Sequence, residues 1–219
     1  MSTNAAHPAR RSSFGPPLAP SFYDRDTERV ARELLGAILL CESPEGAAAG
    51  RIVETEAYLG EHDPACHAAA GLTARTSPLY GPPGTAYVYF IYGAHWCVNA
   101  VTRAAGLPSA VLVRALEPLE GLELMRARRH HPRGDRDLTN GPGKLCAALG
   151  ITDRFNGVSL AEPPLMICRG KAVSDQHVTV TPRIGITRAA DWPLRWLVTE
   201  SPFVSRAPRH GGRRRSRHT

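Results

Sequence analysis

Hydrophobic and polar residues recur along the chain in short blocks that predict its helices and strands. Val30, Leu34 and Leu35 have the spacing of one helix face, and Asp26 precedes them as a candidate N-cap. Apolar or alternating segments predict strands at residues 37–41, 51–58, 85–92, 95–102, 109–116, 164–168, 177–187 and 195–199. Residues 43–50 are expected to form a turn, so that the strands at 37–41 and 51–58 form a hairpin. Further helices are expected at 119–130 and 144–150. Adjacent strands with a few helices are typical of an α+β fold with a mostly antiparallel sheet.

Three segments have no regular pattern. Residues 60–84 contain many Gly, Pro and Ala, and a loop this long is usually functional or disordered. Residues 1–19 and 208–219 are expected to be disordered tails around one domain at 20–207. No apolar run approaches the ~18 residues that span a bilayer, and the N-terminus lacks the apolar core of a secretory signal. We therefore expect a soluble, intracellular protein.

The net charge of +7 comes from the two tails. Seven arginines lie there: Arg10, Arg11, Arg209, Arg213, Arg214, Arg215 and Arg217. The segment between the tails is therefore formally neutral, and the basic tail either binds polyanions non-specifically or is simply disordered. The five cysteines are an odd number without a C-x-x-C pair, which argues against disulfides and a zinc ribbon and predicts buried free thiols.

Two acidic residues stand two positions apart in RIVETEAY. In a strand, Glu54, Glu56 and Tyr58 share one face. Strands disfavour Glu, so this face is either a solvated sheet edge or a carboxylate site.

The next segment, EHDPACHAAAG, contains possible metal ligands. His62, Asp63, Cys66 and His67 match neither H-E-x-x-H nor the zinc deaminase pattern. His67 could instead form a hydrogen bond or a stacking contact.

Three tyrosines lie close together in TAYVYFIYG. Alternation places Tyr87 and Tyr89 on one strand face and Tyr92 on the other, so Tyr89 and Tyr92 are predicted to point in opposite directions. Sheet core accounts for Val88, and Tyr87 has either a core or a supporting role. Tyr92 precedes Gly93 and should lie at a tip, where an exposed aromatic ring can wedge between bases or contact a partner.

Several longer segments together resemble one enzyme family. They read RIVETEAYLGEHDPACHAAAG, ARTSPLYGPPGTAYVYFIYG, CVN, VLVRALEPLEG and GPGKLCAALGI. Their order and spacing closely resemble the alkyladenine (3-methyladenine) DNA glycosylase family, from about Phe22 to Ser205. The resemblance implies a single α+β domain around a curved, mostly antiparallel sheet with peripheral helices. It also implies a DNA repair enzyme that flips a damaged purine out of double-stranded DNA and hydrolyses its N-glycosidic bond.

The resemblance implies roles for the charged residues. Glu56 matches the general base that activates the attacking water. Arg114 matches an arginine near this water and the target phosphate, whereas Glu54 is expected to be structural. Neither Lys144 nor Lys171 matches a nucleophile, so we expect base excision that leaves an abasic site without strand cleavage.

The resemblance also implies how the base is held. Tyr58 and His67 match residues that pack around the flipped base, and Tyr89 matches the residue that stacks on its other face. Asn99 matches a residue that would clash with the exocyclic amine of normal guanine. Tyr92 matches the residue that enters the minor groove and fills the gap in the duplex.

The implied substrates are 3-methyladenine, 7-methylguanine, hypoxanthine and ethenoadenine, and the implied pathway is base excision repair. No cofactor and no metal are implied, no membrane is involved, and a monomer is expected to suffice. In a bacterium the enzyme would be cytoplasmic and associated with the nucleoid. Leu79-Tyr80 replaces the usual Met-Phe, Ala74-Arg75-Thr76 replaces Pro-Arg-Asn, and His95 replaces an aromatic residue of some relatives.

Two other hypotheses are compatible with these residues. A protein with the same fold could bind damaged DNA without cleaving it, although the presence of Glu56 and Arg114 argues against this. A metal-dependent hydrolase could use His62, Asp63, Cys66 and His67.

Overall fold

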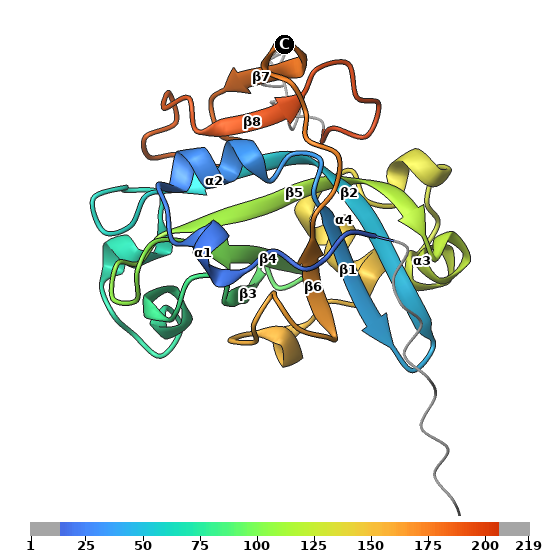
Figure 1. Cartoon of the computed structure of the whole chain (residues 1–219), viewed down its shortest axis with the longest axis horizontal. Helices are drawn as coiled ribbons and strands as arrows, with labels where there is room; N and C mark the ends of the chain where they lie inside the picture. Colours follow the sequence, from blue (N-terminus) through green and yellow to red (C-terminus); the bar gives the residue numbers. More distant parts are fainter. Residues whose placement is uncertain (1–13, 206–219) are drawn as a thin grey trace, which may run out of the picture.

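An antiparallel sheet of eight strands forms the centre of the protein, of which the computed structural model describes residues 14–205. Its strands follow the order β3-β4-β5-β2-β1-β6, with β8 beside β2 and β7 beside β8 (Figure 1). The strands are β1 (Ile38–Ser43), β2 (Gly46–Tyr58), β3 (Ala86–Ile91), β4 (His95–Val101), β5 (Ala110–Glu120), β6 (Leu165–Cys168), β7 (Val178–Thr181) and β8 (Arg195–Val198). All the pairings are antiparallel, which confirms the predicted α+β fold.

Strand β2 is the centre of this sheet. It pairs with β1 near its start, with β8 near its end and with β5 along most of its length. The pairing with β5 shifts register on both sides of Glu54, at Ile52/Glu54 and Glu54/Thr55. Such bulges re-aim side chains, and here they accompany the segment that carries both acidic residues.

Short helices surround the sheet. They are α1 (Pro20–Tyr23), α2 (Thr27–Glu33), α3 (Leu122–Arg128) and α4 (Pro142–Leu149), with 3₁₀-helices η1 (His67–Ala70), η2 (Ser77–Tyr80), η3 (Asp135–Asp137), η4 (Asp153–Phe155) and η5 (Asp175–His177). The Asp26 side chain accepts a hydrogen bond from the Arg29 backbone N–H at 3.0 Å, which confirms the predicted N-cap of α2. Helix α4 packs against β4 and β5, and α2 packs against β2.

Three predicted boundaries are wrong. The predicted helix at 119–130 begins later, because β5 continues through Pro118 to Glu120. The predicted turn at 43–50 is mostly strand, because β2 begins at Gly46 and leaves only a tight turn after β1. Within the predicted strand 177–187, only β7 forms a ladder, and the chain after Thr181 turns toward β2 instead.

The predicted tails lie partly outside the described residues, because 1–13 and 206–219 are not covered. Residues 14–19 were predicted as tail, yet they pack beside β6. Leu18 is buried, and its N–H donates to the Ile167 carbonyl at 2.8 Å. Pro17 forms a bridge with Cys168. The packed region therefore begins before residue 20.

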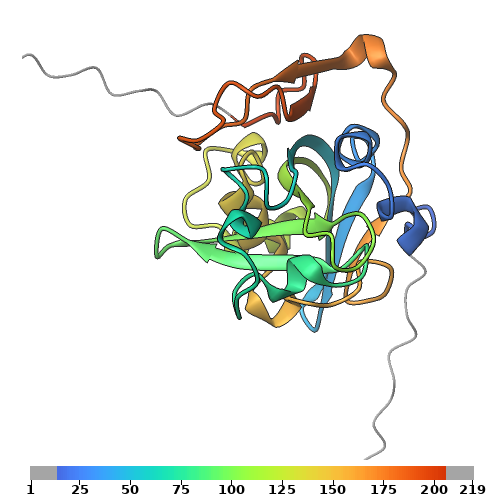
Figure 2. The same cartoon turned by 90° about the vertical axis from the view of Figure 1, so that its left-hand side faces the viewer.

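Two segments extend from the sheet to frame one side of it. The β3–β4 hairpin projects beyond its neighbours, as Figure 2 shows in green. The segment with β7 and β8 lies above the end of β2 and α2 in Figure 1. In residues 14–205, no helix is both long enough and apolar enough to cross a membrane.

Candidate active site in a tyrosine-lined pocket

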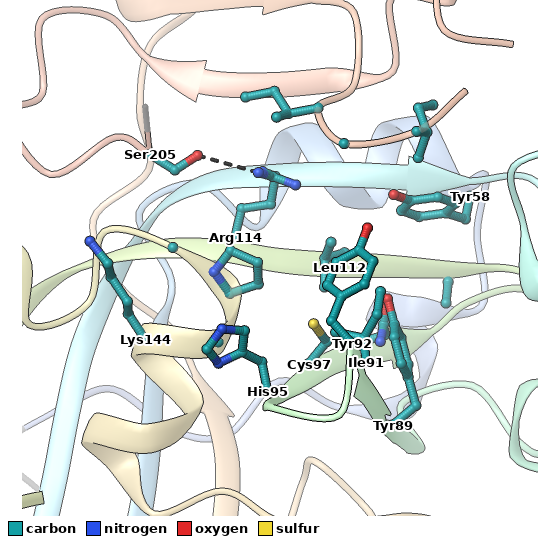
Figure 3. Close-up of a pocket in the computed structure, with 18 of the residues that line it drawn as sticks. Tyr58, Tyr89, Ile91, Tyr92, His95, Cys97, Leu112, Arg114, Lys144 and Ser205 are labelled. Atoms are coloured by element: carbon teal, nitrogen blue, oxygen red, sulfur yellow. Dashed lines mark hydrogen bonds between the residues drawn. The ribbon is translucent and has the colours of Figure 1, made fainter. Parts of the chain in front are cut away.

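A cavity of about 680 Å³ opens between the end of β2, the β3–β4 hairpin, the start of α4 and the C-terminal segment (Figure 3). Its lining includes Tyr58 from β2, Tyr89 from β3, Asn99 from β4 and Arg114 from β5. These residues are far apart in the sequence but adjacent in the sheet, because β2, β5, β4 and β3 are consecutive neighbours. The cavity therefore collects most of the predicted site residues in one place.

Glu56 lies behind the pocket wall with no exposed surface. Its Oε2 accepts hydrogen bonds from the Tyr58 hydroxyl at 2.9 Å and pairs with Arg114 Nη1 at 3.1 Å, and its Oε1 accepts from the Ile184 N–H at 2.7 Å. Tyr58, Arg114 and Ile184 all line the cavity. These three donors therefore hold the carboxylate directly behind the cavity lining.

Arg114 joins the two acidic residues of β2. Its Nε donates to Glu54 Oε1 at 3.0 Å, while its Nη1 faces Glu56. Burial opposes the charged guanidinium, but the carboxylates of Glu56 and Glu54 outweigh burial and raise the pKa of Arg114 above its ordinary value. The alternative of a solvated sheet edge is wrong, because Glu54 and Glu56 are completely buried.

Glu54 is saturated by residues of the C-terminal segment. Arg195 Nε donates to its Oε1 at 2.6 Å, and Ser205 donates from its backbone N–H at 2.6 Å and its hydroxyl at 2.7 Å. Figure 3 shows Ser205 beside Arg114, at 3.4 Å between Arg114 Nη2 and Ser205 Oγ. These contacts agree with the structural role predicted for Glu54, because both of its carboxylate oxygens already accept hydrogen bonds from the protein.

Aromatic residues form two walls of the pocket. Tyr58 and Tyr89 lie at its upper and lower edges in Figure 3. The His67 ring packs against Tyr89, with 4.5 Å between ring centroids. His67 and Tyr89 therefore lie together on one wall of the pocket, whereas the resemblance implied that they face opposite sides of a flipped base.

Burial and neighbouring charges shift the pKa values of Tyr58 and His67. Burial and the Glu56 carboxylate raise the pKa of the Tyr58 hydroxyl well above its ordinary value. Burial and the Arg75 cation lower the pKa of His67, whose Nδ1 is 2.8 Å from the Tyr87 hydroxyl. Tyr87 is buried and also lines the cavity, and its hydroxyl contacts His67, which it thereby supports.

Tyr92 lies at the tip of the β3–β4 hairpin and is 79% exposed. It was predicted to point away from the Tyr89 side, yet it borders the same cavity. Strand β3 ends at Ile91, and Tyr92 adopts a positive φ of 54° in the turn before Gly93. Alternation therefore stops one residue before Tyr92, which is why the predicted direction is wrong.

Asn99 and Lys144 also border the cavity. The Asn99 side chain is buried and donates to the Tyr87 carbonyl at 3.0 Å, so its amide is fixed. Lys144 donates to Asn140 at 2.7 Å and pairs with Asp137. His95 lies at the rim beside Gly143, where an added Cβ would come within 2.8 Å of His95.

In the segment considered as a possible metal site, the central contact is an ion pair with an arginine. Asp63 is buried and forms a two-pronged ion pair with Arg183. Its oxygens also accept from the backbone N–H groups of Leu59 and Ala65. Within residues 14–205, no three His, Cys, Asp or Glu side chains converge as they would around a metal ion. All five cysteines are free and buried, as predicted.

Sequence reasoning missed the contributions of residues 183–205. Arg183, Arg195 and Ser205 form hydrogen bonds with residues of β2 and its following loop. The only local signal was arginine inside otherwise apolar, strand-like segments, PRIGIT and RWLVT. An arginine in such a segment indicates a buried cation. It does not indicate which residue pairs with that cation, because the partner lies more than a hundred residues away in the sequence.

Comparison with known proteins identifies the class of this protein. Residues 21–202 match the family model described as methylpurine-DNA glycosylase. The protein is therefore a DNA glycosylase, a hydrolase of N-glycosyl bonds in DNA. The chain belongs to the methylpurine-DNA glycosylase family.

Curated relatives from bacteria and archaea agree with this assignment. One from Myxococcus xanthus is 50% identical over 200 residues, which cover 90% of this chain and 97% of the relative. Another from Rhodopseudomonas palustris (strain HaA2) is 49% identical over 205 residues, covering 94% and 98%. A third from Methanocella arvoryzae is 48% identical over 198 residues, covering 88% and 98%. All three carry the provisional name 3-methyladenine DNA glycosylase.

Proposed function

We propose that the pocket receives a damaged purine flipped out of double-stranded DNA and that Glu56 activates the water that displaces it. The observation that carries this proposal is the position of Glu56, held by three donors that all line the cavity. The water would give a proton to the Glu56 carboxylate and attack the anomeric carbon of the sugar, and the bond from that carbon to the base would break. The products are a free base and an abasic site, which begins base excision repair.

The aromatic walls supply the binding energy for the flipped base. A base enters between Tyr58 on one side and Tyr89 with His67 on the other. Extrusion costs a few kcal/mol, and each stacking contact returns about 1–3 kcal/mol. N-alkylated purines such as 3-methyladenine and 7-methylguanine carry positive charge, so aromatic faces attract them further. Hypoxanthine and ethenoadenine are neutral and depend more on shape and stacking.

Tyr92 and Asn99 carry the remaining roles in this proposal. Tyr92 is exposed at the projecting tip, where its ring can enter the minor groove and fill the gap left in the duplex. Asn99 is fixed by its bond to Tyr87, so it cannot swing away from a bulky exocyclic amine. Normal guanine would clash with it, whereas hypoxanthine lacks that amine.

The main proposed role of Arg114 is to orient the Glu56 carboxylate. Its guanidinium touches Glu56, Glu54 and Ser205, so it orients the general base, and a contact with the target phosphate is a further part of its proposed role. No lysine forms a covalent intermediate in this scheme, and the DNA strand stays intact. We further propose that a monomer acts on each lesion and that it works inside the cell, at the genomic DNA.

The test is single-turnover base release in EDTA from a labelled duplex with a central hypoxanthine, and from a parallel duplex with 7-methylguanine. Wild type should release the base from at least one duplex and leave an alkali-sensitive abasic site. Glu56→Gln should lower the rate by about 10²–10⁴-fold, the usual contribution of a general base, while it still binds the duplex. Glu117→Gln, at a half-exposed pair with Arg51, is the matched control and should keep the wild-type rate.

Three results would overturn the proposal. Comparable turnover by Glu56→Gln would remove Glu56 as the general base. Tight binding of both duplexes by wild type without any release would indicate a damage-binding protein instead. Loss of wild-type activity in EDTA, restored by a divalent metal, would favour a metal-dependent hydrolase.

A further inference from the structure

Arg183 lies directly behind the Tyr58 wall of the pocket. Its Cζ is 4.7 Å from the centroid of the Tyr58 ring and 6.0 Å from that of Trp192. Tyr58 lines the cavity and Arg183 does not. The guanidinium therefore covers the face of the Tyr58 ring that points away from the cavity.

Three further contacts fix the plane of this guanidinium. Its Nη1 donates to the Ala57 carbonyl at 3.0 Å, and both its Nη1 and Nη2 pair with the Asp63 carboxylate. The side chains of Arg183 and Asp63 have no exposed surface. A planar fork with two parallel bonds holds its orientation much better than a single ammonium would.

The same ion pair organises the loop that leads to the opposite wall. Asp63 accepts from the N–H groups of Leu59 and Ala65 at 3.1 and 3.0 Å. This loop continues through Cys66 into η1, whose first residue is His67. The Arg183–Asp63 pair thus connects the support of Tyr58 with the segment that carries His67.

We propose that Arg183 is a positioning residue for base extraction, which fixes the ring of Tyr58 against a flipped base and sets the spacing between the two aromatic walls. This inference rests on the proposed function, since it concerns how the same pocket binds its base. The Tyr58 hydroxyl is tethered to Glu56 at 2.9 Å, and Arg183 supplies the second restraint, on the face of the ring. With only the hydroxyl tether, the ring could rotate about it and lose stacking.

The test uses Arg183→Lys, which retains the positive charge but loses the planar fork. A duplex with a central 1,N6-ethenoadenine reports extraction through the change in fluorescence of this base on leaving the stack. In a Glu56→Gln background, Arg183→Lys should weaken extraction by between about 10- and 100-fold, the size expected of a misplaced binding surface. Binding to a duplex that already contains an abasic site analogue should change less than about threefold, because no base needs stacking there.

A double-mutant cycle separates positioning from general destabilisation. If Arg183 acts through Tyr58, Arg183→Lys should cost little further extraction once Tyr58→Leu has removed the ring. Arg154→Lys is the matched control, since Arg154 also stacks on a ring, with its Cζ 4.6 Å from the Phe155 centroid, but that ring does not border the cavity, whereas Tyr58 does. It should leave extraction unchanged. Asp63→Asn should also weaken extraction. It replaces Arg183→Lys as the test variant if Arg183→Lys fails to fold.

The outcomes distinguish the two proposals. If wild type releases no base from any damaged duplex, the proposed function fails, and this inference fails with it. If wild type releases base but Arg183→Lys and Asp63→Asn extract ethenoadenine as well as their parent, only the inference is overturned. Equal losses with and without Tyr58 would also overturn it, since they would show that Arg183 acts independently of that ring.

Discussion

The protein interior contains a cluster of two negative and two positive side chains that form ion pairs with one another: Glu54, Glu56, Arg114 and Arg195. Glu54 pairs with both Arg114 and Arg195, and Arg114 also reaches Glu56. All four are buried. Removing one partner of a buried ion pair leaves an uncompensated charge, which costs far more than the pair contributes. The orientation of Glu56 therefore depends on Glu54, although Glu54 does not face the cavity.

This dependence predicts the effect of Glu54→Gln. The amide leaves Arg114 and Arg195 short of one negative charge, so the free energy of unfolding should fall by about 3–5 kcal/mol. Urea unfolding measures this loss. Glu117→Gln removes a half-exposed partner of Arg51 and should cost less than about 1 kcal/mol. A loss for Glu54→Gln no larger than for this control would show that the buried cluster is not electrostatically coupled.

Among the elements, the β3–β4 hairpin combines strain with exposure. Tyr92 and Gly93 both have positive φ, 54° and 63°, in the three-residue connection 92–94 between Ile91 and His95. A bulky aromatic residue in the left-handed region is unusual. Strain of this kind is tolerated where function requires it, which agrees with the proposed role of Tyr92 as the residue that fills the duplex.

Tyr92→Asn should therefore separate stability from function. We expect the free energy of unfolding to rise by up to about 1 kcal/mol, since Asn tolerates this backbone conformation. Extraction of the base should fall several-fold or more, while binding to an abasic duplex falls less. Thermal unfolding and base release measure the two effects. Phe90→Ala removes an exposed ring of the same hairpin that does not border the cavity, and it should leave extraction nearly unchanged.

At the scale of the whole molecule, titration of buried groups limits stability at both extremes of pH. Burial works against the Asp63 carboxylate, but hydrogen bonds from Arg183, Leu59 and Ala65 outweigh it and lower the pKa. This stabilisation is complete above the ordinary pKa of about 3.9 and is lost as the pH falls through the lowered value. Burial raises the pKa of Tyr58 and Tyr89, so their contribution is complete below about pH 10 and is lost above it.

The lowered pKa of His67 adds an earlier loss on the acid side, because the unfolded chain takes up a proton there below about pH 6.5. The free energy of unfolding should therefore be nearly constant between about pH 7 and 10 and should fall on both sides. Urea unfolding across pH 3–11 measures this profile. Asp63→Asn should be less stable at pH 7 and should lose less on acidification, because the titrating carboxylate is gone. An acid limb that is equally steep in Asp63→Asn would assign acid sensitivity to other carboxylates.

Local patterns were sufficient for the parts of the protein that neighbouring residues determine. The α2 N-cap, the β1–β2 hairpin, the strands through Tyr87 and Asn99 and the buried cysteines follow from periodicity and turn chemistry. The family resemblance also pointed to Glu56 and Arg114, which the structure places in contact. Boundaries failed where tertiary pairing extended a strand past its local signal, as in β5.

Only the tertiary structure decided which groups meet. The sequence by itself determined an α+β sheet, two acidic residues on one face of β2 and a tyrosine-rich hairpin. It could not show that Glu54 is buried against Arg195 and Ser205, that His67 and Tyr89 share a wall, or that Arg183 covers Tyr58. Alternation describes side chains within one strand, whereas these contacts join segments up to 151 residues apart. Their geometry depends on how the C-terminal segment packs over the end of β2, and no local pattern encodes that.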